Sequence, residues 1–323
     1  MRINFNKTNF LCLITYMVFG AKIAFGAAGF EQLTLEIAAK QHAFLPMEPI
    51  FITITLSNKT NATIMGHTVI EQGTDFLEIY VATKEGEPFK KWREASLVVP
   101  SMERFEGCEI KPGYKKQVTA KLYGTSPPSN IAPEKYDPNE IIKCYLLPYP
   151  GTYRIKATLK NISGKGIIES NVITIEAIQP AGQDAAAYDF LKTISHPLFL
   201  TSSFSRHSSK YEQKVLAKQE DFLSQFPDSH YSRYMSYSLG LTYVAKKGEY
   251  INDGIQLLEK VGIYEDFWLA EDALKKLVEI SMKKEQYEKA KGYLEILKRR
   301  FPDNLGYLEE AGKLGKLISN SKE

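Results

Sequence analysis

The sequence predicts a multidomain protein with an all-β first part and an all-α second part. Apolar residues recur with a period of two from Gln32 to Ile178, whereas after Gly182 they recur about every 3.6 residues. The chain has 323 residues, which is more than a single hydrophobic core usually serves. We therefore expect a β domain over residues 27–180 and an α-helical domain over residues 181–323, both preceded by a signal peptide over residues 1–26.

The first 26 residues have the pattern of a secretory signal. Arg2 and Lys7 give a basic start, and the apolar run 10–21 is too short to span a bilayer. Ala24 and Gly26 place small residues where a signal peptidase reads the chain. We expect cleavage before Ala27, with cleavage before Gly29 as the second choice. An uncleaved anchor is the alternative, and Lys22 within the stretch argues against it. The pattern predicts an exported protein, periplasmic or extracellular, with no transmembrane segment after cleavage.

Charge and cysteine content limit which classes of partner and which disulfides are possible. The formal charge of +3 comes from Arg2, Lys7 and Lys22, because 41 basic residues less these 3 leave 38, which equals the 38 acidic residues. A nucleic-acid partner requires a basic surplus, so we expect none. Two cysteines, Cys108 and Cys144, follow the signal segment, and export permits a disulfide between them. The alternative is two separately buried thiols.

Six segments of the first part are predicted to be strands, because apolar and β-branched residues alternate or cluster between polar, Gly or Pro punctuation. They are Leu33–Ile37, Ile50–Leu56, Phe76–Val81, Val118–Tyr123, Tyr153–Leu159 and Ile167–Ile178. The proline-rich segment Ser126–Ile141 lies among them and is predicted to be a long irregular loop. It is either a simple insertion or a binding site.

Two short motifs frame these strands. The sequence Pro-Met-Glu-Pro-Ile enters a strand at Ile50, and Pro-Gly-Thr-Tyr precedes another at Tyr153. Over about residues 30–178 this arrangement resembles the immunoglobulin-like domains of exported bacterial proteins. The resemblance implies an antiparallel β-sandwich. In an exported protein, the loops of such a domain, including Ser126–Ile141, would suit carbohydrate or cell-wall binding.

The second part contains the sequence Phe-Pro-Asp twice, at Phe226 and 75 residues later at Phe301. Proline cannot continue a helix, and Asp or Ser accepts the free amides at the start of the next helix, so each copy separates two helices. Asp184 is expected to cap an earlier helix over residues 185–192. Residues Asp303–Ile318 are expected to form a terminal helix.

Apolar residues between the two copies lie at helical spacing. One set comprises Leu274, Leu277 and Ser281, followed by Tyr287, Ala290, Leu294 and Leu297; a looser set comprises Leu239, Gly240 and Tyr243, followed by Tyr250 and Gly254. These spacings match the tetratricopeptide repeat, a helix pair of about 34 residues. The stretch is similar to periplasmic tetratricopeptide proteins of envelope assembly. The resemblance implies a helical repeat array whose first helices line a concave face.

That face would be the partner-binding site. The resemblance places nine residues there: Tyr234, Tyr237, Leu241, Val244, Asp272, Lys275, Glu279, Met282 and Lys283. Ordinary helix packing is the alternative role for the tyrosines and for Leu241. The sequence carries no zinc-protease, nucleophile-elbow or Walker motif. We expect a non-enzymatic adaptor or scaffold for protein or peptide partners, with no cofactor and no metal. The alternative is a carbohydrate- or cell-wall-binding protein.

Overall fold

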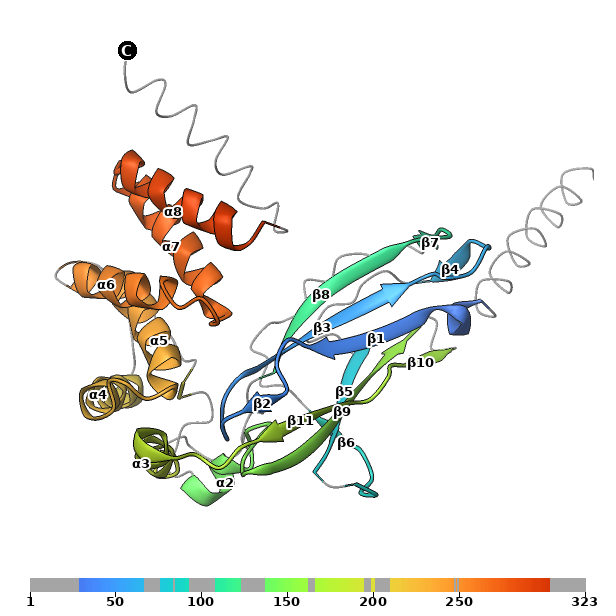
Figure 1. Cartoon of the computed structure of the whole chain (residues 1–323), viewed down its shortest axis with the longest axis horizontal. Coiled ribbons are helices and arrows are strands. Elements are labelled where there is room, and N and C mark those ends of the chain that lie inside the picture. Colours follow the sequence, from blue (N-terminus) through green and yellow to red (C-terminus); the bar gives the residue numbers. More distant parts are fainter. Residues whose placement is uncertain are drawn as a thin grey trace, which may run out of the picture. The chain divides into compact units, whose positions relative to one another are not determined.

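The computed structural model of the chain describes residues 29–66, 76–83, 85–92, 108–122, 137–161, 166–194, 199–200, 210–246, 248 and 250–302. The chain divides into two compact units (Figure 1). The first comprises Met1–Ser129 and Ile142–Gln179, and the second comprises Asn130–Ile141 and Pro180–Glu323. Strands make up the first unit, and helices follow one another in the second (Figure 1).

The first unit contains three sheets. An antiparallel sheet has the order β1 (Thr34–Ala39), β3 (Ile50–Ser57), β8 (Lys115–Leu122). A six-stranded sheet has the order β2 (Ala43–Phe44), β11 (Ile173–Ala177), β9 (Gly151–Lys160), β5 (Leu77–Ala82), β6 (Lys90–Trp92), and β10 (Ile167–Glu169) also pairs with β9. The third sheet pairs β4 (Ile64–Gly66) with β7 (Cys108–Ile110), and a short 3-10 helix, η1 (Phe30–Gln32), precedes β1.

The core of this unit follows the period-two pattern. In β9, Tyr153, Ile155, Ala157 and Leu159 are all buried, as their alternation predicts. The even-numbered residues of β3, from Ile50 to Leu56, are also completely buried. Tyr153 also fixes the turn that leads into β9, because its hydroxyl donates a 2.7 Å hydrogen bond to the carbonyl of Tyr149.

One buried carboxylate organises the six-stranded sheet. Glu78 on β5 accepts hydrogen bonds from Lys91 on β6 at 2.5 Å, from Lys160 on β9 at 2.6 Å and from Tyr80 at 2.7 Å. Burial opposes its ionisation, but the bonds from Lys160 and Lys91 outweigh burial and hold the pKa of Glu78 at about 2. The ion cluster therefore joins three neighbouring strands.

The second unit contains α3 (Gly182–Leu191), α4 (Lys210–Gln225), α5 (Tyr231–Lys246), α6 (Tyr250–Gly262), α7 (Leu269–Lys283) and α8 (Tyr287–Arg300). From α4 onward, each of these helices packs against the next one in sequence. A further short helix, α2 (Pro138–Ile142), ends the segment predicted to be an irregular loop. That part of the loop prediction is wrong, and residues 126–136 lie outside the described residues.

The first Phe-Pro-Asp sequence forms the turn between α4 and α5. Asp184 does not cap its own helix: the N-cap of α3 is Ala181, which makes no side-chain capping bond. The Asp184 carboxylate instead accepts hydrogen bonds from the Ser229 hydroxyl and the His230 amide, both at 2.7 Å. Asp184 therefore ties α3 to the start of α5. The second copy begins at Phe301, and its last residue lies outside the described part of the chain, as does the predicted terminal helix.

Helices α5 and α6 approach each other through two glycines. A Cβ atom placed on Gly254 would lie 2.9 Å from the carbonyl oxygen of Gly240 and 2.9 Å from the amide nitrogen of Val244. Real Cβ atoms do not come this close to backbone, and backbone cannot move aside as a flexible side chain can. The predicted small residue of the next pair, Ala290 on α8, is completely buried.

The predicted fold class, an immunoglobulin-like antiparallel β-sandwich followed by a tetratricopeptide-like array, is wrong. The chain has a mixed α and β architecture: among the described residues there are sheets of three, six and two strands, a parallel β2–β11 pair and a short helix, α2, between β8 and β9 in the sequence. Several predicted strands coincide with β1, β3, β5, β8 and β9. The periodicity of apolar residues identifies which segments form strands or helices, but it does not determine which strands pair.

Replacing Gly254 by Ala should destabilise the helical unit. Alanine improves helix propensity by about 1 kcal/mol, but its methyl group overlaps backbone of α5, and such overpacking costs about 1–3 kcal/mol. Gly292 on α8 is the matched control, because a Cβ there meets nothing within 4 Å. Urea unfolding followed by far-UV circular dichroism should show Gly254→Ala less stable and Gly292→Ala more stable than the natural chain. Equal stabilisation by both changes would contradict the close approach.

The Glu78 cluster should make the stability of the first unit depend on acid pH. The folded-state pKa of about 2 lies below the ordinary value of 4.5, so the cluster stabilises the fold above pH 4.5 and loses this effect as pH falls toward 2. Glu78→Gln should cost about 1–3 kcal/mol at pH 7 and little near pH 2, as measured by urea unfolding across this range. Glu36→Gln, in an exposed pair with Lys59, should have a much smaller effect. A pH-independent loss in Glu78→Gln would refute this account.

Candidate functional site

Three of the four predicted site residues on α5 form one partly exposed stripe. Tyr237, Leu241 and Val244 are half-buried and lie four and three residues apart, so they share a face of the helix. Tyr234 does not belong to this surface. It is 1% exposed, and its ring packs edge-on against Phe267 with centroids 4.8 Å apart. Tyr234 is therefore a packing residue, which was the alternative role.

Helix α7 brings predicted charged residues to the same region. Burial and then the Asp272 charge raise the pKa of Tyr237. Helices α5 and α7 are in direct contact. We call Tyr237, Leu241, Val244, Asp272, Lys275 and Glu279 the α5/α7 face.

The other charges on α7 pair along their own helix. Lys275 contacts Glu271 at 2.6 Å, and Glu279 accepts bonds from Lys276 at 2.7 Å and Lys283 at 2.5 Å. These two lysines lower the pKa of Glu279. Met282 is half-buried near the end of the helix. The α5/α7 face is therefore an aliphatic and aromatic strip beside charges that are largely neutralised.

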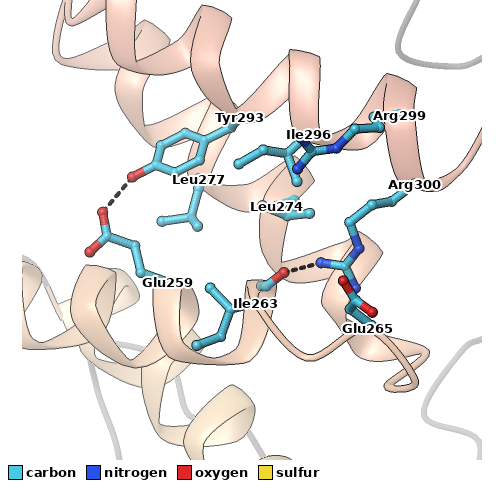
Figure 2. Close-up of a pocket in the computed structure, with 10 residues that line it drawn as sticks. Glu259, Ile263, Glu265, Leu274, Leu277, Tyr293, Ile296, Arg299 and Arg300 are labelled. Carbon is cyan, nitrogen blue, oxygen red and sulfur yellow. Dashed lines mark hydrogen bonds between the residues drawn. The ribbon is translucent and has the colours of Figure 1, made fainter.

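A separate groove lies between α6, α7 and α8. Its volume is about 420 Å³, and we call it the α6/α8 groove (Figure 2). Its lining residues are Glu259, Gly262, Ile263, Glu265, Leu274, Leu277, Tyr293, Ile296, Arg299 and Arg300. Leu274 and Leu277 form a buried floor, whereas Ile263 at the mouth is 71% exposed.

Two hydrogen-bonded contacts hold the walls of the groove together. The Tyr293 hydroxyl on α8 donates to the Glu259 carboxylate on α6 (Figure 2). Burial, followed by this bond, raises the pKa of Tyr293. Arg300 donates to the carbonyl of Gly262, where α6 ends, and to the carbonyl of Tyr264 at 2.5 Å. A cation at this position satisfies carbonyls that a helix C-terminus leaves open.

Sequence reasoning did not find the α6/α8 groove. Tyr293 and Ile296 lie three residues apart on α8, beside the buried stripe of Ala290, Leu294 and Leu297. A second apolar stripe on one helix indicates a second packed or binding face. The other signal for the groove in the sequence was Ile263, a large apolar residue directly after Gly262, where α6 ends.

The remaining predictions about sites concern metals, disulfides and membranes. Within the described ranges, no three His, Cys, Asp or Glu side chains are grouped as metal ligands would be. Cys144 is buried, but the side chain of Cys108 lies outside the described residues, so the disulfide stays a prediction. None of the described helices is long and apolar enough to cross a bilayer. The signal segment also lies outside the described residues.

Comparison with known proteins identifies no family. No family model matches the chain, and no curated protein is significantly similar to it. Among solved structures, Spo0M, the sporulation control protein from Bacillus subtilis, shares 10% identity with a TM-score of 0.26, covering 48% of this chain and 52% of that chain.

Two enzymes are similarly distant. A β-glucosidase from Listeria innocua shares 11% identity with a TM-score of 0.24, covering 46% of this chain and 16% of that chain. The alkylpurine DNA glycosylase AlkC from Pseudomonas fluorescens, in a structure bound to DNA containing an abasic site analog, shares 8% identity with a TM-score of 0.26. The match covers 46% of this chain and 31% of that chain. The chain thus spans about half the length of Spo0M and less of the two enzymes. At these TM-scores the similarities establish neither a family nor an activity.

Proposed function

We propose that this protein is an exported, non-enzymatic adaptor that binds a protein or peptide partner through the α5/α7 face. The observation that carries the proposal is the strip of Tyr237, Leu241 and Val244, which is left partly open beside the paired charges of α7. A partner that covers these side chains gains the free energy of burying apolar surface. The charged side chains of α7 along the edge then favour a partner whose charges are complementary to them.

Export rests on the first 26 residues. Their basic start, short apolar run and small residues before Ala27 are typical of a cleaved signal. Mass spectrometry of the protein isolated from its natural source should give Ala27 as the first residue. A protein that keeps Met1 and remains in the cytosol would contradict export. This result would leave the proposed role of the α5/α7 face unaffected.

One group of polar residues supports the non-enzymatic part of the proposal. Ser229, Asp184 and His230 resemble the residue types of a catalytic triad, but Ser229 and the His230 amide both donate to Asp184 at the start of α5. A nucleophile requires a base that accepts its proton and a third group that orients the base. Here the Asp184 carboxylate accepts hydrogen bonds from the Ser229 hydroxyl and the His230 amide and serves as a cap at the start of α5.

Site-specific photo-crosslinking tests the proposed face. A benzophenone amino acid at Leu241 should capture a discrete partner in the compartment where the mature protein resides. The same probe at Ala217, exposed on α4, should not. Leu241→Asp should weaken that partner's binding at least ten-fold, about 1.4 kcal/mol. Equal capture from both positions, or unchanged affinity in Leu241→Asp, would overturn the proposal.

A second candidate function is binding of carbohydrate or cell-wall polymer by the first unit. The observation that favours it is a group of cations over aromatic rings on the six-stranded sheet. Arg154 and Lys156 lie 5.1 and 5.2 Å from the ring centroid of Phe89, and Lys156 also lies over Tyr80. Retention of the mature chain on peptidoglycan, lost in Phe89→Ala, would favour this function over the adaptor.

A further inference from the structure

We infer that the α6/α8 groove is a second binding site, separate from the α5/α7 face, which takes an acidic segment of a partner protein bearing large aliphatic side chains. The inference does not depend on the proposed function, because different side chains line the two surfaces, although α7 contributes to both. The α5/α7 face uses Tyr237 and Asp272, whereas the groove uses the outer sides of α6 and α8.

The floor and mouth of the groove determine the apolar part of the ligand. Leu274 and Leu277 are 2% and 1% exposed, while Ile296 and Tyr293 are half-buried on the wall. Ile263 also lines the groove (Figure 2), and 71% of its surface is exposed, so the apolar lining includes a side chain open to solvent. A volume of about 420 Å³ accommodates two or three aliphatic side chains, within the size range of ordinary ligand pockets.

The wall formed by α8 determines the charge of the ligand. This helix carries five basic and two acidic residues, a net charge of +3. Lys289, Tyr293, Ile296 and Arg299 lie four, three and three residues apart and therefore share one side of α8. Among the described residues, Lys289 and Arg299 have no ion-pair partner. Arg299 lines the groove, and Lys289 lies on the same side of α8 one turn before Tyr293, so this side of α8 carries two available cations.

Two acidic residues, Glu259 and Glu265, also line the groove, on α6 and on the turn after it. Glu259 accepts a hydrogen bond from the Tyr293 hydroxyl, and this bond fixes its carboxylate against the wall. Glu265 is exposed on the turn after α6. Arg300 is engaged with the carbonyls of Gly262 and Tyr264. On the α8 wall the groups left to meet a ligand are Lys289 and Arg299, so the part of the ligand that lies against α8 is acidic.

The spacing of the two cations indicates the form of the ligand. Ten residues separate Lys289 from Arg299, which corresponds to about 15 Å along the helix axis. A partner helix of about ten residues spans the same distance. Aliphatic side chains three and four residues apart on one face would enter the groove, and carboxylates at either end would reach the two cations.

Fluorescence anisotropy with defined peptides tests the inference on the full mature chain. The probe is a labelled peptide of about twelve residues with leucines spaced three and four apart and glutamates between them. A second peptide replaces every glutamate by lysine. The acidic peptide should bind at least ten-fold more tightly than the basic one. Ile263→Ser and Arg299→Gln should each weaken it at least five-fold, and Arg299→Gln should also reduce the salt dependence of binding.

Controls distinguish this site from other occupants. Leu241→Ser on the α5/α7 face should leave peptide affinity unchanged, and unfolding curves of Ile263→Ser should match the natural chain because this side chain is exposed. Absence of saturable binding, or equal affinity for both peptides, would overturn the inference. Evidence that a second copy of the chain or a membrane occupies the groove would also overturn the inference. Ile263→Ser would then abolish self-association in sedimentation, or binding to phosphatidylglycerol vesicles, and leave peptide affinity unchanged.

Discussion

The contact on which the helical unit depends is the backbone approach of α5 and α6 at Gly240 and Gly254. Any side chain at Gly254 would collide with the Gly240 carbonyl and the Val244 amide, so these helices pack more closely than side chains normally permit. This contact positions Leu258 against α5 and leaves Gly262 at the end of α6 beside Leu274 of α7. Each later helix then packs on the one before it.

Two separate surfaces follow from this packing. Because α7 contacts both α5 and α6, it supplies charges to the α5/α7 face on one side and the floor of the α6/α8 groove on another. The first surface is mainly aliphatic with charges paired along α7, whereas the second combines an apolar floor with available cations on α8. We therefore expect the two surfaces to recognise different partners, which suits an adaptor.

The sequence predicted local features better than long-range ones. The alternation of Tyr153 to Leu159 identified β9 and its buried face, and the Phe-Pro-Asp at Phe226 identified the end of α4, because period and proline act within a few residues. Asp184 was assigned to the wrong helix because its hydrogen-bond partner Ser229 lies 45 residues away. Strand pairing, the burial of Tyr234 and the groove depend equally on distant contacts, which no local pattern encodes.

Native-state hydrogen exchange of the full chain tests the role of the α5–α6 contact most directly. If this contact holds the unit together, the amides of residues 240–244 and 254–258 should exchange most slowly within residues 210–302 and should become exposed in a single opening step. Fast exchange of α6 while α5 remains protected would show that the two helices open independently, and it would contradict the account.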